Sequence, residues 1–128
     1  MSVRVVRLGS ARAGGEGLRI GTVRRPPRGV PKAKFASENW YDVWLPELAP
    51  SEATVKLGQK AESQAQWNAF ARRYASEMQA PSASRMLDVL AALSRSADFS
   101  VGCYCEVEAR CHRSVLRRLL KARGAKLA

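Results

Sequence analysis

The chain's 128 residues suit a single domain over 1–128 that is large enough to bury a core. Its apolar runs are too short for a membrane span, its first residues lack the apolar core of a signal peptide, and its three cysteines are an odd number for a secreted disulfide scaffold, so we expect a cytoplasmic protein with no membrane partner. The formal net charge of +11 is concentrated in residues 1–34 and 110–128, which favours an anionic partner unless these charges serve only solubility.

The first part of the chain has the pattern of short strands joined by loops. Residues 3–8 and 18–24 alternate and are rich in β-branched side chains, which predicts two strands on either side of a glycine-rich loop. Residues 25–31 contain three prolines and predict a stiff, extended loop. Residues 40–46 contain two tryptophans and fit either a short strand or a buried loop.

Helices follow, and then one more strand and helix. We expect a short helix capped by Ser51, a helix over 64–79, a third helix that Pro81-Ser82 caps, a strand over 99–105 and a helix over 111–123 stopped by Gly124. The apolar spacing predicts the buried face of each of the last three helices. In the helix over 64–79 it consists of Trp67, Phe70, Ala71, Tyr74 and Met78, and in the next helix of Met86, Leu87, Val89, Leu90 and Leu93. In the helix over 111–123 the buried residues are Val115, Leu116, Leu119 and Leu120, whereas Arg113, Arg117, Arg118 and Lys121 face out. The aromatic stripe is interpreted as core packing.

This order of elements predicts a small three-layer α/β domain with a short, at least partly parallel sheet flanked by helices. All three cysteines and the only histidine lie between Cys103 and His112, where the last strand leads into the last helix. Open α/β sheets bind ligands at such a junction. We therefore predict a site at 103–114 for a small phosphate- or carboxylate-bearing ligand. The candidate catalytic residues are His112, Cys111 and Cys103, and the candidate ligand-binding residues are Arg24, Arg25, Arg28, Arg113, Ser114 and Glu106.

The chemistry of these residues leaves alternatives open. Cys111 is predicted at a helix amino end between two arginines, which favours its thiolate, whereas two nearby glutamates oppose it. A buried, unreactive thiol is the alternative. His112 suits a general base because its ordinary pKa is near neutrality, but the favoured interpretation is a helix-cap or loop histidine bonded to the backbone.

A metal site is the third interpretation of this segment. Cys103, Cys105, Cys111 and His112 are potential ligands, but their spacing lacks the paired C-x2-C pattern of structural zinc sites. We therefore expect no metal and no cofactor. We expect Cys103 and Cys111 to lie close enough for their thiols to react with each other. The loop from Cys105 to Arg110 differs from the phosphate-binding cysteine loops of phosphatases and rhodaneses, because it has no glycine and contains two acids.

The chain also resembles a known family. Gly102-Cys103-Tyr104-Cys105-Glu106 followed by Cys111-His112-Arg113-Ser114, together with residues 17–30, residues 44–51 and the helix of Trp67, Phe70 and Tyr74, is similar to the domain-of-unknown-function 488 (DUF488) family in its YeaO-like branch. The chain keeps the family's spacing between Cys103 and Cys111, but Cys105 stands at a position where the family more commonly has glutamate. The resemblance implies a small α/β fold in a bacterial protein and no established activity.

Three functions are therefore weighed. The first is the anionic-ligand site at 103–114, whether it binds only or also catalyses. The alternative is a nucleic-acid-binding module that uses the basic N- and C-terminal segments; its aromatic residues are not interleaved with the arginines, and no helix-turn-helix, zinc-finger or RNP signature is present. The third is an interaction protein without chemistry.

Overall fold

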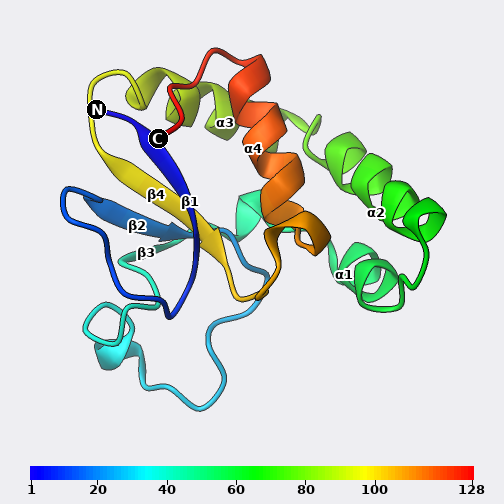
Figure 1. Cartoon of the computed structure of the whole chain (residues 1–128), viewed down its shortest axis with the longest axis horizontal. Coiled ribbons are helices and arrows are strands. Elements are labelled where there is room, and N and C mark those ends of the chain that lie inside the picture. Colours follow the sequence, from blue (N-terminus) through cyan, green and yellow to red (C-terminus); the bar gives the residue numbers. More distant parts are fainter.

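A computed structural model describes residues 1–128 and has a four-stranded parallel sheet at its centre (Figure 1). The strands are β1 (Val3–Arg7), β2 (Leu18–Gly21), β3 (Val43–Trp44) and β4 (Phe99–Cys103), in the order β1-β4-β2-β3. Every strand pairing is parallel. All five residues of β4 are buried, so the last strand of the chain forms the centre of the sheet.

Four α-helices complete the domain: α1 (Glu52–Gln59), α2 (Gln64–Glu77), α3 (Pro81–Leu93) and α4 (His112–Ala122). Short 3₁₀ turns lie at Lys32–Lys34 (η1), Pro46–Leu48 (η2) and Glu108–Arg110 (η3). These elements confirm the α/β class and the parallel sheet that the sequence predicts. None of the helices combines the length and hydropathy that a membrane-spanning segment requires.

Local sequence signals explain most helix ends. The Ser51 hydroxyl accepts the Thr54 N–H at 3.3 Å and caps α1 as expected. After α4, Gly124 has a φ of +84° and its N–H donates to the Lys121 carbonyl, which ends the helix. The start of α3 corrects an expectation, because no side chain caps it. Pro81 lies in its first turn, where the missing N–H costs nothing.

One face of the sheet packs against helices. Val3, Phe99 and Val101 belong to a single apolar cluster with buried residues of α2, α3 and α4: Trp67, Phe70, Tyr74, Leu87, Leu90, Val115, Leu116 and Leu120. The predicted buried face of α3 is too wide, because Met86, Val89 and Leu93 are 37%, 64% and 40% exposed. An α-helix buries only a stripe, which in α3 follows Ala83, Leu87, Leu90 and Ala91.

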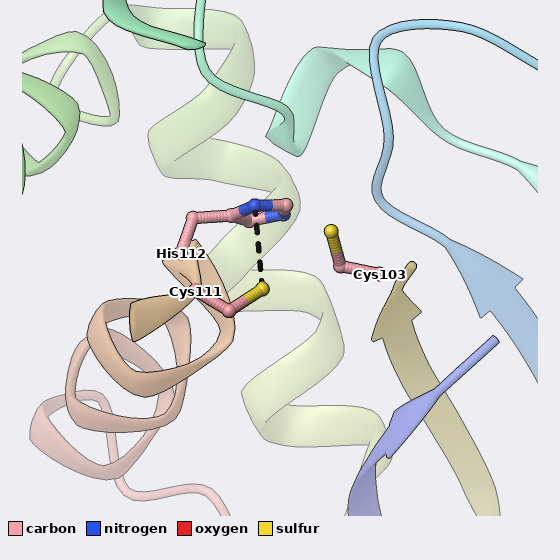
Figure 2. A group of neighbouring side chains, drawn as sticks. All are labelled: Cys103, Cys111 and His112. Atoms are coloured by element: carbon pink, nitrogen blue, oxygen red, sulfur yellow. Dashed lines mark hydrogen bonds between the residues drawn. The ribbon is translucent and has the colours of Figure 1, made fainter. Parts of the chain in front are cut away.

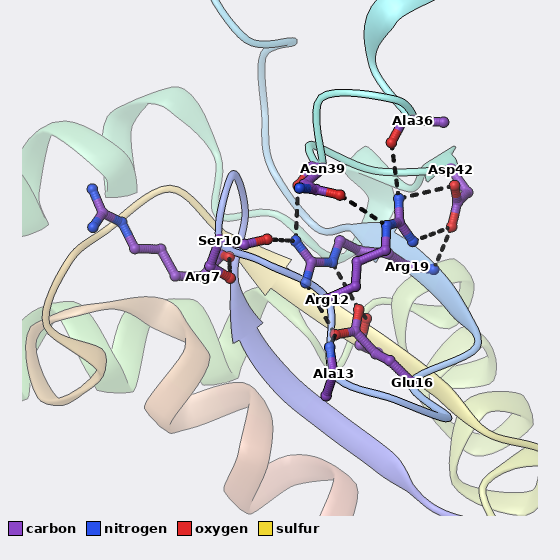
Figure 3. A network of polar contacts seen from close by, with 10 residues as sticks. Arg7, Ser10, Arg12, Ala13, Glu16, Arg19, Ala36, Asn39 and Asp42 are labelled. Carbon is purple, nitrogen blue, oxygen red and sulfur yellow. Dashed lines mark hydrogen bonds and ion pairs between the residues drawn. The ribbon is translucent and has the colours of Figure 1, made fainter.

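Loops cover the opposite face of the sheet. Successive strand residues point to opposite faces, so Arg19 and Ser100 face away from that cluster. Both side chains are fully buried and hydrogen-bond to the carboxylate of Glu16 in the loop after β1. Figure 3 shows that Arg19 also reaches two loops from separate parts of the chain, through the backbone oxygens of Ser10 and Asn39. The third layer is thus formed by loops that a buried ion pair holds in place.

Candidate functional site

The candidate site lies where β4 ends and α4 begins. β4 ends at Cys103, and Cys111 is the N-cap residue of α4. The loop between them returns toward the strand, so that the two sulfurs and a ring nitrogen of His112 all lie within 4.8 Å of one another (Figure 2). The three residues are only 7%, 1% and 6% exposed. We call them the Cys–Cys–His cluster; the structure brings together all three candidate catalytic residues.

The tautomer of His112 follows from its hydrogen bonds. Its Nε2 is 2.8 Å from the backbone oxygen of Thr22, and because a carbonyl only accepts, Nε2 carries the proton. In this tautomer Nδ1 is the nitrogen that can accept a hydrogen bond or bind a metal, and it lies 4.0 Å from the Cys111 sulfur. His112 is therefore bonded to the backbone, as one interpretation expected, and still presents a free nitrogen to a thiol.

The two buried cysteines differ in acidity. Hydrogen bonding from Cys103, with further contributions from Cys105 and His112, lowers the pKa of Cys111. Hydrogen bonding with Cys105 and Cys111, together with burial, raises the pKa of Cys103. The Cys105 sulfur is exposed and lies 3.8 Å from that of Cys103. The strand expected over 99–105 ends at Cys103, so Cys105 belongs to the loop, and the loop holds its sulfur close to that of Cys103.

A cavity of about 750 Å³ adjoins the cluster. Its walls include all three cysteines and His112, and four arginines: Arg24, Arg25, Arg28 and Arg110. The proline-rich loop therefore runs beside the start of α4, although about 80 residues separate them in the sequence. Cationic side chains and thiols thus line one cavity.

Arg24, Arg25 and Arg28 differ in how many hydrogen bonds and ion pairs they form within the chain. Arg24 donates to two backbone carbonyls just before α1. Arg25 forms an exposed ion pair with Glu52. Arg28 is exposed and makes no hydrogen bond or ion pair within the chain. Its donors are therefore available to a ligand.

Three predicted ligand-binding residues are engaged elsewhere and do not line the cavity. Arg113 is only 4% exposed and donates to the Cys105 carbonyl at 2.6 Å, so the expectation that it faces outward is wrong. Its place in the first turn of α4 directs the guanidinium toward the loop that joins β4 to α4. Ser114 donates to the Cys111 carbonyl, and exposed Glu106 pairs with Arg7.

Two residues of the candidate site are absent from the predicted catalytic and ligand-binding residues. Arg110 lines the cavity and its guanidinium lies 5.8 Å from the ring centre of Trp67, a residue interpreted only as core. Thr22 orients His112 through its backbone oxygen, a group that every residue has. The basic character of Arg110 was a usable signal, whereas no sequence signal marks a carbonyl.

Fold and site together define a small α/β protein with a cysteine–histidine cluster at the carboxyl end of its central parallel strand. The chain belongs to the DUF488 family: residues 3–124 match the model of DUF488-N3a, described as the active DUF488-N3 subclade. This match confirms the family that the sequence resembles, while the YeaO-like branch stays a prediction. No curated protein and no solved structure matches the chain.

Proposed function

We propose that this protein binds a small phosphate- or carboxylate-bearing molecule in the cavity at residues 103–114. The observation that supports it best is the shared lining, in which the unpaired Arg28 and the Cys–Cys–His cluster border one space. A guanidinium presents parallel N–H donors that match the oxygens of a carboxylate or phosphate. The ligand would therefore be held beside the cluster.

The start of α4 supports the same ligand chemistry. Cys111 occupies the N-cap position but makes no capping hydrogen bond with its side chain. The first N–H groups of a helix have no partner within the helix and carry partial positive charge. An anion in the cavity would meet both this charge and the arginines. His112, Cys111 and Cys103 remain the candidates for a catalytic step, because their thiols and imidazole lie together in the wall of this cavity.

Nucleic-acid binding by the basic segments has less support. Many of the arginines are engaged in ion pairs with acidic residues of the same chain, in the pairs Arg12–Asp42, Arg19–Glu16, Arg25–Glu52, Arg117–Glu108 and Arg123–Asp88. A nucleic-acid surface needs cations free to replace the counterions of the phosphate backbone. Pairing within the chain reduces the number available.

Isothermal titration with inorganic phosphate and with acetate tests the proposal. Arg28→Ala should weaken binding by about tenfold, a loss of about 1.4 kcal/mol, in line with ~1.5–3 kcal/mol for a hydrogen bond to a charged group. Arg118→Ala is the matched control, because Arg118 is exposed on α4 outside the cavity and its loss changes the net charge equally. Equal losses in both variants, varying only with ionic strength, would indicate a diffuse basic surface and contradict the proposal.

A further inference from the structure

We propose that Cys103, Cys111 and His112 bind a zinc ion whose fourth coordination position faces the cavity. This inference rests on the proposed function in one respect, since the anionic ligand would then lie beside the metal. The spacing in the sequence argues against a metal. The tertiary structure changes that conclusion, because it brings donors from the end of β4 and the start of α4 together.

The separations of the donor atoms suit zinc. Bond lengths of ~2.3 Å to sulfur and ~2.0–2.1 Å to nitrogen at tetrahedral angles place the donors of a zinc site roughly 3.5–3.8 Å apart. Here the three donor atoms lie within 4.8 Å of one another, and the Cys111 sulfur and His112 Nδ1 are 4.0 Å apart. Binding would therefore draw the three donor atoms closer together than they are without a metal. Thiolate and imidazole are also the donor types that zinc prefers.

The surroundings of His112 match those of a metal-bound histidine. Such a histidine usually donates its second ring N–H to a carbonyl or carboxylate, which fixes the ring and frees the other nitrogen for the metal. His112 donates from Nε2 to the Thr22 carbonyl at 2.8 Å and turns Nδ1 toward the Cys111 sulfur. The edge-on ring of Tyr74, 5.3 Å away between centres, packs against the imidazole.

The cavity explains why one coordination position stays open. Three protein ligands plus water or substrate is the arrangement of catalytic zinc, whereas structural zinc has four protein ligands. All three proposed ligands line the cavity, and their burial shields the metal on the protein side. A bound Zn²⁺ would displace the protons of the two thiols, which leaves a centre without net charge. Its open coordination position would accept an oxygen of an anion held beside Arg28.

The full-length protein, stripped of metal with a chelator and then titrated with Co²⁺ and Zn²⁺, tests the site. We expect one ion per chain, with the charge-transfer absorption of thiolate-bound Co²⁺. Cys103→Ser and His112→Gln should each weaken Co²⁺ binding by more than tenfold. Cys105→Ser is the matched control and should change the affinity less than threefold, because this exposed cysteine is outside the proposed ligand set.

Zinc protection of the wild-type thiols is a second measurement that does not depend on folded variants. Zn²⁺ should slow iodoacetamide labelling of Cys103 and Cys111 by more than tenfold and slow that of the exposed Cys105 much less. Absence of stoichiometric Co²⁺ binding, or absence of protection, would overturn the proposal. An equal loss of affinity in Cys105→Ser would overturn the open fourth position, because Cys105 would then occupy it.

Phosphate titration of the zinc-loaded and zinc-free forms separates this inference from the proposed function. We expect phosphate to bind the zinc-loaded form about tenfold more tightly. Zinc binding without phosphate affinity in either form would contradict the proposed function and leave the metal site standing. Phosphate binding that added zinc does not change, with no stoichiometric metal binding, would contradict the zinc site and leave the anion site standing.

Discussion

Replacing Arg19 with methionine should remove a large part of the protein's stability, because it leaves a buried carboxylate without its partner. The Arg19 guanidinium is fully buried and donates to both carboxylate oxygens of Glu16, at 2.8 and 3.0 Å (Figure 3). It also donates to the backbone oxygens of Ser10 and Asn39, each at 2.8 Å. Removing one partner of a buried pair costs about 3–5 kcal/mol, against a typical total of ~5–15 kcal/mol for a domain.

The pH dependence of the wild type's stability also reports on the Glu16–Arg19 pair. Burial acts to raise the pKa of Glu16, but hydrogen bonds from Arg19 and Ser100 outweigh it and lower that pKa from 4.5 to about 2. A difference of about 2.5 pKa units between the folded and unfolded chain corresponds to roughly 3 kcal/mol. Because the folded pKa is the lower one, this stability is present above pH 4.5 and is lost as the pH falls toward 2.

Arg19→Met should weaken this trend. Without the guanidinium, only the hydrogen bonds from Ser100 and the Ala13 N–H oppose the effect of burial, so the pKa of Glu16 rises and acidification from pH 7 costs less stability than in the wild type. Urea denaturation from pH 7 down to pH 3 measures both slopes. The double variant Glu16→Gln/Arg19→Met removes both charges and should be more stable than Arg19→Met at pH 7. A loss below about 1 kcal/mol in Arg19→Met, or the wild-type pH slope in that variant, would refute the reasoning.

Two further predictions concern the packing around the sheet. Gly17→Ala should destabilise the protein far more than Gly15→Ala in thermal melts, because both glycines have positive φ but only at Gly17 would a Cβ meet backbone, 1.9 Å from the Asp98 oxygen; equal losses would contradict this. Tyr74→Phe removes the buried 2.6 Å hydrogen bond from the tyrosine hydroxyl to the backbone oxygen of Leu48. It should lower the free energy of unfolding by ~1–3 kcal/mol, measured by urea denaturation. An unchanged midpoint would show that water replaces the hydroxyl.

The sequence by itself determines most of the helices and strands and the location of the candidate site. Hydrophobic spacing, the Ser51 cap and Gly124 act through contacts within a few residues, so they can be predicted without knowing the fold. The candidate catalytic residues could be placed for the same reason, since β4 and α4 are consecutive and one short loop joins them. The identity of the family also follows from sequence alone.

The tertiary structure decides which remote residues meet this junction. β4 enters the sheet between β1 and β2, which brings Thr22 to His112 across 90 residues of chain. The same packing buries Arg113, which helix periodicity placed in solvent, and leaves Arg28 free beside the thiols. Local patterns do not record such contacts, because the free energy of a buried polar group depends on partners that only the folded chain supplies.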